Sequence, residues 1–432
     1  IGGAEPGATV EYSANGSDGW STTAPTSSEG QNTFYVRQVD TAGNTSQAAS
    51  FTYTYDTTAP NAPVVTSVVD NASGNISSVA VLGTAEPNSA ITVFDGSQML
   101  GTATANSDGT WSYSIPASDI VKNDILHATA TDVAGNTSGA SPDQSVIIGT
   151  QTADDISGTA GAETILALSG DDMIRGFVGA DQIDGGAGYD TLVLTGTSAD
   201  LNAASDSQLV NVEAVSAAAA AAGVTVDLST QSEGLTITGS ASADTLVGGA
   251  GADTIHAGEG NDTLKGGPGN DVLDGGRLVQ FIAPSDWNDI DYADYSGATA
   301  GVTVNLATGV AQGDASVGTD ALSGIERVIG SSYNDALTGA STYSEWFQPG
   351  AGDDYIDGGT GYDTVSYATA TAGITVNMAG GIVTGDASVG TDTLRGIETI
   401  VGTAYADTYN ATGYTAFYAT SPSANADNGL YG

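Results

Sequence analysis

From Gly149 onward, apolar and acidic residues recur with a nine-residue period. Residues 149–193 divide into five consecutive nonapeptides, and residues 239–274 divide into four more. In every one, position 6 is acidic and position 8 is Ile or Leu, and glycine is frequent at positions 1, 2 and 4. One apolar residue between two outward-facing neighbours predicts a three-residue strand, and glycine permits the positive φ of a tight turn. We expect two nonapeptides, about 18 residues, to form one coil, so that each stacks on the second one before it.

A longer repeat occupies the C-terminal part of the chain. Ala298–Gly330 recurs as Ala370–Gly402, an offset of 72 residues, and further nonapeptides lie within and between the two copies. Extra residues before Asp291 and at 342–348 interrupt the pattern. Insertions in a solenoid loop out on one face. These segments therefore either contact a partner or cover an exposed patch.

Residues 1–148 show another pattern, in which short alternating runs are separated by turn residues. Gly2–Ser13 resembles Gly83–Asp95, and the segments around Trp20 and Trp111 also match. Such short strands predict β-sandwiches. The segments resemble the bacterial immunoglobulin-like domains that repeat along large surface adhesins. We therefore expect an all-β chain with a partial immunoglobulin-like domain at 1–56 and a complete one at 57–148. A parallel β-solenoid should follow at 149–432. Within this solenoid the regular nonapeptides span 149–193 and 239–274, and the 72-residue repeats span about 291–432.

Three aspartates lie where the immunoglobulin-like domains join. Asp40 and Asp132 belong to matching AGN loops, and Asp56 lies in the linker. In adhesins of this kind, acidic residues at such junctions can bind calcium. The alternative is an Asx-turn, in which the carboxylate accepts hydrogen bonds from its own loop.

Composition restricts the function further. The chain has 7 Lys and Arg against 51 Asp and Glu, a formal net charge of −44, and no cysteine. This charge repels nucleic-acid phosphates and anionic lipids, and the absence of cysteine excludes disulfides and Cys-based zinc sites. No apolar run is long enough to span a membrane. Since 40% of the residues are apolar, we expect an ordered chain, either with calcium as the counter-charge or with a solvated acidic surface.

The position-6 acids are the candidate metal ligands. Stacked coils bring pairs of carboxylates together with the carbonyl oxygens of the glycine turns, and Ca²⁺ prefers oxygen ligands of this kind. Without a cation the stacked carboxylates would repel each other, so folding and calcium binding should be coupled. Glu163 departs from the aspartate pattern, and its longer side chain should weaken its site. The predicted ligands are Asp154, Glu163, Asp172, Asp181, Asp190, Asp244, Asp253, Asp262, Asp271, Asp320, Asp335, Asp354, Asp363, Asp392 and Asp407.

The repeat GGxGxDxUx, where U is apolar, is the calcium-binding nonapeptide of RTX proteins, and this chain resembles that family through most of 149–432. The resemblance is strongest to large RTX adhesins that Gram-negative type I systems secrete. It implies Ca²⁺ as the cofactor, an extracellular or cell-surface location, and an unknown surface or receptor as partner.

The expected function is a non-catalytic structural segment that folds and stiffens on binding calcium and serves attachment or matrix formation. Two alternatives stay open. One is a subunit of an S-layer, sheath or fibre that self-assembles through the solenoid. The other is the secretion module of an RTX enzyme. The sequence contains no GxSxG, HExxH or P-loop motif, and neither His127 nor His256 has a convincing set of catalytic partners.

Overall fold

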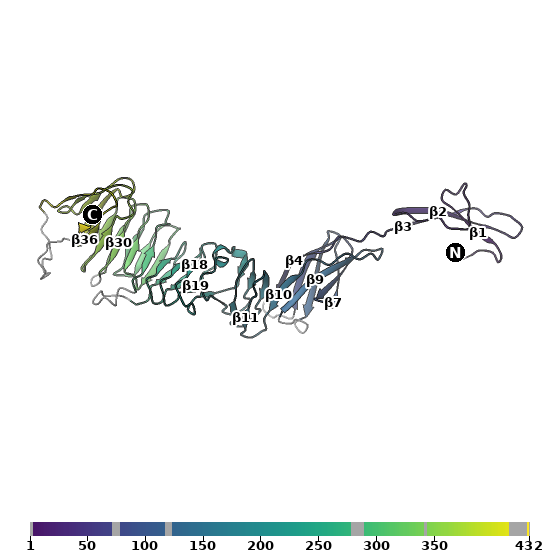
Figure 1. The fold of residues 1–432 in the computed structure, drawn as a ribbon, viewed down its shortest axis with the longest axis horizontal. Helices are drawn as coiled ribbons and strands as arrows, with labels where there is room; N and C mark the ends of the chain where they lie inside the picture. The colour runs from purple at the N-terminus through teal and green to yellow at the C-terminus, as the bar shows by residue number, and fades with distance from the viewer. Residues whose placement is uncertain are drawn as a thin grey trace. The chain divides into compact units, whose positions relative to one another are not determined.

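Apart from two short 3-10 turns, η2 (Leu201–Ala203) and η3 (Asp206–Gln208), every regular element described in the computed structural model is a β-strand. The structure describes residues 3–70, 78–116, 123–277, 289–340, 344–413 and 430–431. These residues form two units, 1–145 and 146–432, and Figure 1 traces them from purple to yellow. The all-β prediction is confirmed. No helix in the described ranges is long and apolar enough to cross a membrane.

The N-terminal unit consists of antiparallel strands. Its first 56 residues form one three-stranded sheet in the order β1-β2-β3. In the following segment, β4 and β8 flank β5, and β7 and β9 flank β6. Val81, Ile91, Val93, Leu126 and Ala128 are fully buried there. The strands are β1 (Thr9–Ser13), β2 (Gly30–Val39), β3 (Ala49–Tyr55), β4 (Val64–Asp70), β5 (Ser78–Thr84), β6 (Ala90–Asp95), β7 (Gln98–Thr104), β8 (Thr110–Pro116), β9 (Asn123–Thr131) and β10 (Gln144–Ile148), which crosses the unit boundary.

The second unit is a solenoid with two main sheets. We call the sixteen-stranded one the long sheet. Its strands, in spatial order, are β11 (Asp155–Ser157), β13 (Met173–Arg175), β15 (Thr191–Val193), β17 (Ala214–Ser216), β19 (Thr236–Thr238), β21 (Thr254–His256), β23 (Val272–Asp274), β27 (Thr319–Ser323), β26 (Val310–Gln312), β25 (Thr303–Asn305), β29 (Ala336–Thr338), β31 (Tyr355–Asp357), β35 (Thr391–Arg395), β34 (Ile382–Thr384), β33 (Thr375–Asn377) and β37 (Thr408–Asn410).

The opposite side of the solenoid has nine strands in the sheet that we call the short sheet. It is preceded by a parallel ladder in which β14 pairs with β12 and with β16. The ladder strands are β12 (Glu163–Leu166), β14 (Gln182–Asp184) and β16 (Leu209–Val210). The short-sheet strands are β18 (Thr225–Asp227), β20 (Thr245–Val247), β22 (Thr263–Lys265), β24 (Tyr292–Asp294), β28 (Arg327–Ile329), β30 (Trp346–Gln348), β32 (Thr364–Ser366), β36 (Thr399–Val401) and β38 (Leu430–Tyr431).

Register in the regular segments follows the nonapeptide. Ile156 pairs with Ile174, which in turn pairs with Leu192, so that strands 18 residues apart lie side by side and parallel. Leu246 and Leu264 have the same relation on the short sheet. Each coil therefore contains two nonapeptides, as the sequence predicts. Of the two irregular segments, residues 278–288 and 341–343 lie outside the described residues.

Each 72-residue repeat contains a feature that the nonapeptide pattern does not predict. β26 pairs antiparallel with both β25 and β27, and β34 does the same with β33 and β35. The turn between β25 and β26 has only four residues and ends at Gly309, whose φ is +64°. A short turn of this kind permits an antiparallel return, whereas a parallel crossover needs a longer connection. The long sheet therefore contains two antiparallel insertions in an otherwise parallel stack.

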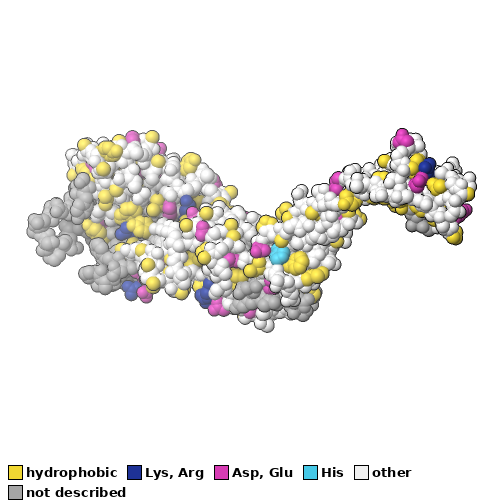
Figure 2. Space-filling view, turned by 45° about the vertical axis from the view of Figure 1, so that its right-hand side comes forward, with side chains coloured by type: hydrophobic (Ala, Val, Ile, Leu, Met, Phe, Trp, Pro, Cys, Tyr) yellow, Lys and Arg dark blue, Asp and Glu magenta, His cyan; other side chains and the backbone are white. Residues whose placement is uncertain are grey.

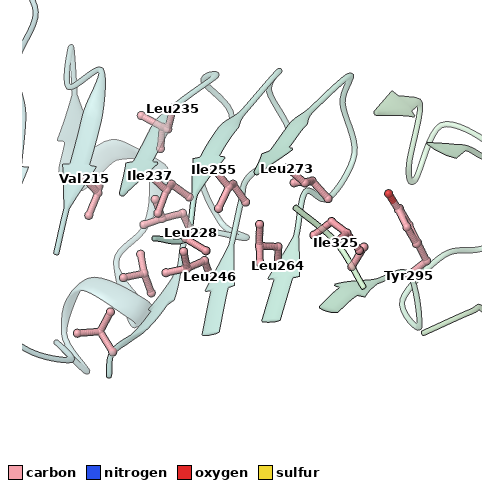
Figure 3. Packing of buried hydrophobic residues seen from close by; sticks show 14 of the residues in the cluster. Val215, Leu228, Leu235, Ile237, Leu246, Ile255, Leu264, Leu273, Tyr295 and Ile325 are labelled. Atoms are coloured by element: carbon pink, nitrogen blue, oxygen red, sulfur yellow. The ribbon is translucent and has the colours of Figure 1, made fainter. Parts of the chain in front are cut away.

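The core of the solenoid is a column of position-8 side chains. Ile237, Ile255 and Leu273 extend from the long sheet, and Leu246 and Leu264 from the short sheet, and all five are fully buried. Figure 3 shows these side chains pointing toward one another between the two layers. A coil thus buries only one large side chain per strand, so its stability depends strongly on the stacking of neighbouring coils.

Candidate metal-binding loops

The position-6 acids lie at the bend before each strand, and they connect successive coils. The backbone N–H of Asp154 donates to Oδ1 of Asp172 over 2.7 Å, and the N–H of Asp172 donates to Oδ1 of Asp190 over 2.8 Å. On the other side, the N–H of Asp244 donates to Oδ1 of Asp262 over 2.7 Å. Each of these carboxylates therefore accepts a hydrogen bond from the acid one coil earlier. We call this series the carboxylate ladder.

The ladder continues where the sequence period is interrupted. The N–H of Asp262 donates to Oδ1 of Asp291, 29 residues later, over 2.9 Å. The N–H of Asp271 donates to Oδ1 of Asp320, 49 residues later, over 3.1 Å. The position in the stack, and not the number of intervening residues, thus decides which acids meet.

Five ladder members were absent from the predicted ligand set. Oε2 of Glu213, Glu326 and Glu398 accepts the N–H of a preceding aspartate, and the N–H of Glu345 donates to Asp363. The fifth is Asp291, which shares its 72-residue offset with Asp363. The sequence also contained signals for three of the other four acids. Glu213 and Glu326 occupy equivalent places in the similar segments LVNVEAV and LSGIERV. Glu345 precedes Asp363 by 18 residues, the length of one coil.

In one class of loop, protein donors also reach the second carboxylate oxygen. The N–H of Ser240 at position 2 donates to Oδ2 of Asp244 over 2.5 Å, and the N–H of Gly249 donates to Oδ2 of Asp253 over 2.7 Å. We call these closed loops. In the loop of Asp181 the donor is the N–H of Val178, at position 3. The predicted ligands in closed loops are Asp154, Glu163, Asp181, Asp244, Asp253, Asp335 and Asp407.

In a second class, which we call open loops, the buried Oδ2 atom has no hydrogen-bond partner. The residue at position 2 has a positive φ in all seven of these loops, including Leu168 at +80° and Gly267 at +99°. This rotation turns the position-2 N–H away from the carboxylate. In three loops, among them that of Gly186, it donates instead to the aspartate that ends the preceding strand. The open-loop aspartates are Asp172, Asp190, Asp262, Asp271, Asp291, Asp354 and Asp363, and Oε2 of Glu345 is also buried without a partner.

Two predicted ligands belong to neither class. Oδ2 of Asp320 accepts a hydrogen bond from the hydroxyl of Tyr295 over 3.2 Å, and Oδ2 of Asp392 accepts one from Tyr367 over 2.8 Å. Both tyrosines are buried, and the two pairs are related by the 72-residue offset. At these two rungs a phenol therefore supplies the donor that the carboxylate lacks in an open loop.

The open loops match the donor set that calcium requires. An unpartnered, buried carboxylate oxygen normally requires an explanation such as a bound ion. The stacked loops also place main-chain carbonyl oxygens very close to the glycines of the next coil, because a Cβ built on Gly188 would lie 1.8 Å from the carbonyl oxygen of Gly170. In the described part of the chain, no three Asp, Glu, His or Cys side chains converge as a metal-binding group. Carbonyl oxygens would therefore have to complete the shell, and oxygen-only ligation favours Ca²⁺ over softer metals.

The electrostatics of the open loops also favour a cation. Burial, together with the neighbouring carboxylates of Asp262 and Glu326, raises the pKa of Asp291 to about 9. Burial likewise raises the pKa of Asp354 to about 8 and that of Asp271 to about 7. Without a positive partner, ionising these groups at neutral pH costs free energy. A bound divalent cation would remove that cost.

The raised pKa values predict an unusual pH dependence for the calcium-free protein. An unfolded aspartate has a pKa of about 4, so between that pH and about 7 to 9 the folded solenoid binds protons that the unfolded chain does not. Stability contributed by these groups is complete below about pH 4 and is lost as the pH rises through their folded values. We expect the urea midpoint of metal-depleted protein, followed by circular dichroism, to be higher at pH 5 than at pH 8. A midpoint that is equal or higher at pH 8 would contradict this.

The acidic loops around Asp40 and Asp132 are satisfied by hydrogen bonds within each loop. Oδ1 of Asp40 accepts the N–H groups of Ala42 and Asn44, and Oδ2 accepts the amide of Asn44. Hydrogen bonds from Asn44 lower the pKa of Asp40, and Asn136 lowers that of Asp132 in the same way. This geometry is that of an Asx-turn.

Comparison with known families agrees with this geometry. A model of the RTX calcium-binding nonapeptide repeat matches four times, at residues 157–192, 236–264, 247–277 and 350–365. A bacterial Ig domain matches residues 59–146. The chain thus carries RTX-type calcium-binding repeats and a bacterial Ig domain. Three of the four RTX matches fall largely on the regular coils, and the fourth covers β31 and the start of β32. The Ig match covers strands β4–β9.

A further similarity, to a solved structure, is weaker. A solved structure titled "Biofilm associated protein - BSP domain" is 21% identical over 32% of this chain and 24% of that chain. Its TM-score is 0.17, so it carries no structural argument. A search of curated proteins finds no match. Repeats and Ig-like domains of this kind are typical of structural, non-catalytic proteins.

Proposed function

We propose that the open loops bind Ca²⁺ and that calcium orders the solenoid. The observation that carries this proposal is the coincidence, in seven loops, of a positive φ at position 2 and a buried Oδ2 atom without a partner. Asp172, Asp190, Asp262, Asp271, Asp291, Asp354 and Asp363 would each offer one carboxylate oxygen, and neighbouring carbonyls would supply the others. Bound calcium would neutralise stacked charges that otherwise oppose folding.

Among the remaining predicted ligands, the closed-loop and tyrosine-paired acids would have a structural role. Apart from Asp154, which accepts a hydrogen bond at Oδ2 alone, both carboxylate oxygens of these acids are engaged by N–H or O–H donors, as in Asp253 and Asp392. These acids connect coils through hydrogen bonds alone. The proposal thus divides the fifteen predicted ligands into six that bind metal and nine that fasten neighbouring coils.

At the level of the whole chain, the proposed role is an extracellular structural segment of an adhesin. Immunoglobulin-like domains at 1–56 and 57–148 would act as spacers, and the solenoid at 149–432 would stiffen when it meets calcium outside the cell. The match to RTX repeats and to a bacterial Ig domain supports this setting. Attachment to a surface or incorporation into a matrix would be the outcome.

Metal stoichiometry tests the calcium proposal. We expect the purified chain, dialysed against millimolar CaCl₂ and analysed by inductively coupled plasma mass spectrometry, to retain several calcium ions per molecule. Dialysis against MgCl₂ should retain far less metal, because Mg²⁺ demands octahedral geometry and keeps its water. A calcium content near zero would reject the proposal.

A further inference from the structure

Positive charge is rare in this chain, and within the described segments two cations lack an acidic partner. Six of the seven Lys and Arg residues lie in described segments. In those segments no carboxylate lies within 4.0 Å of Lys265 or Arg327, and both residues belong to the short sheet. Figure 2 shows how few basic side chains, in dark blue, the drawn face carries. The paired cations are Arg37 with Glu11, Arg175 with Asp155, Arg277 with Asp289 and Arg395 with Asp357.

Arg327 lies between two aromatic rings on the outer face of the short sheet. Tyr292, Arg327 and Trp346 are register partners on the adjacent strands β24, β28 and β30. The guanidinium carbon is 4.9 Å from the centroid of the Tyr292 ring and 5.3 Å from that of the Trp346 ring. All three side chains are half-buried. Lys265 follows on β22, the neighbour of β24, and faces the same side.

The guanidinium has more donors than the protein satisfies. Arginine carries five N–H groups. One of its terminal nitrogens donates to the hydroxyl of Tyr292, whereas the buried Nε has no acceptor in the described structure. The buried Nε is closed to solvent, so an external ligand would meet the terminal nitrogens, for one of which the structure describes an acceptor, the hydroxyl of Tyr292. A further partner of the guanidinium must be an acceptor, and opposite charge favours a carboxylate.

The solenoid itself does not require this group. In the second 72-residue copy, Thr364 and Thr399 replace Tyr292 and Arg327, and strands β32 and β36 still pair in the same parallel register. Tyr292 and Arg327 are therefore present only in the first 72-residue copy, and the parallel pairing of the strands does not depend on them.

We propose that Lys265, Tyr292, Arg327 and Trp346 form a binding site for an acidic sugar residue of a glycan. The guanidinium would hold the sugar carboxylate, and the flanking rings would contact the C–H face of the pyranose. The net charge of −44 disfavours long polyanions, so the ligand is an isolated uronic-acid unit in a largely neutral glycan. Asp294, which lies on β24 beside Lys265, would restrict the carboxylate to the Arg327 side. This site is independent of the calcium proposal.

Saturation-transfer NMR on the calcium-loaded chain tests the site, with D-glucuronic acid, D-glucose and N-acetylglutamate as separate probes. The decisive variant is Tyr292→Thr/Arg327→Thr, which copies the second repeat. The control Arg395→Thr removes one positive charge from an exposed ion pair elsewhere. Circular dichroism and calcium content verify that each variant folds. Should the double variant fail to fold, Arg327→Gln provides the same comparison.

We expect transfer to the ring protons of glucuronic acid, with affinity reduced at least about tenfold in the double variant, since a charge-assisted hydrogen-bonded pair is lost. The Arg395→Thr control should bind like the parent chain. Equal binding of glucose would overturn the carboxylate assignment. Binding of N-acetylglutamate without glucuronic acid would indicate an acidic peptide instead and overturn the sugar assignment. Unchanged affinity in the double variant, or no binding of any probe, would also overturn the site.

Discussion

Removal of calcium with EGTA at neutral pH and low salt should abolish most of the β-sheet structure in residues 149–432 and spare the immunoglobulin-like domain at 57–148. The reason is electrostatic, because stacked, buried carboxylates such as Asp262 and Asp291 lose their counter-charge together. Hydrogen–deuterium exchange with mass spectrometry would locate the change. We expect the amides of β19–β23 to exchange rapidly in EGTA and to regain protection when calcium is restored.

Strands β5 and β8 provide the internal control for this experiment. They belong to a domain whose core is apolar, including Val81 and Ile115, both fully buried, so their amide protection should not change. Retained protection of β19–β23 in EGTA would refute the coupling of folding to calcium. Equal loss of protection in both regions would show general destabilisation instead.

The second large effect is expected from replacing Asp271 by Asn and comparing it with the same change at Asp253. Both aspartates serve the long sheet in successive coils, and the N–H of Asp253 donates to Oδ1 of Asp271. Asparagine keeps an acceptor for that bond but removes the charge. Since Asp271 has the unpartnered Oδ2, Asp271→Asn should lower the calcium content by about one ion and destabilise the calcium-loaded solenoid.

Asp253→Asn is the matched control, because Gly249 already donates to the second oxygen of Asp253. We expect its calcium content to equal that of the parent chain. Both variants would be measured by mass spectrometry of bound metal and by thermal unfolding in excess calcium. Equal losses in the two variants would show that open and closed loops do not differ in metal binding.

Much of the solenoid could be predicted because the nonapeptide fixes two things at once. The single apolar residue at position 8 identifies the inward-facing residue of each strand, as at Ile174 and Leu264. The constant spacing then places strands 18 residues apart in register. In these coils the local hydrophobic pattern and the long-range stacking therefore predict the same strand register.

The antiparallel insertions could not be predicted in this way. Alternation such as that in Val302–Leu306 is compatible with either strand direction, because inward and outward residues alternate in both. Direction is decided by the four-residue turn that ends at Gly309 and by pairing with β27, which lies seven residues beyond β26 in the chain.

The distinction between open and closed loops also lies beyond sequence reasoning. Gly249 and Gly267 occupy the same position in GGAGADTIH and GGPGNDVLD, yet only Gly267 has a positive φ. Conversely, Leu168 adopts φ +80° despite its side chain. The peptide orientation depends on contacts with the adjoining coil, and residue type alone does not set it.

The carboxylate ladder has a consequence for how such modules evolve. The same hydrogen bond joins acids that are 18, 29, 38 or 49 residues apart, as between Asp244 and Asp262 or between Asp354 and Asp392. The segments inserted between these acids leave the ladder intact. A lineage could thus lengthen this scaffold by small insertions or by copying whole blocks, and every intermediate would still fold on the same template.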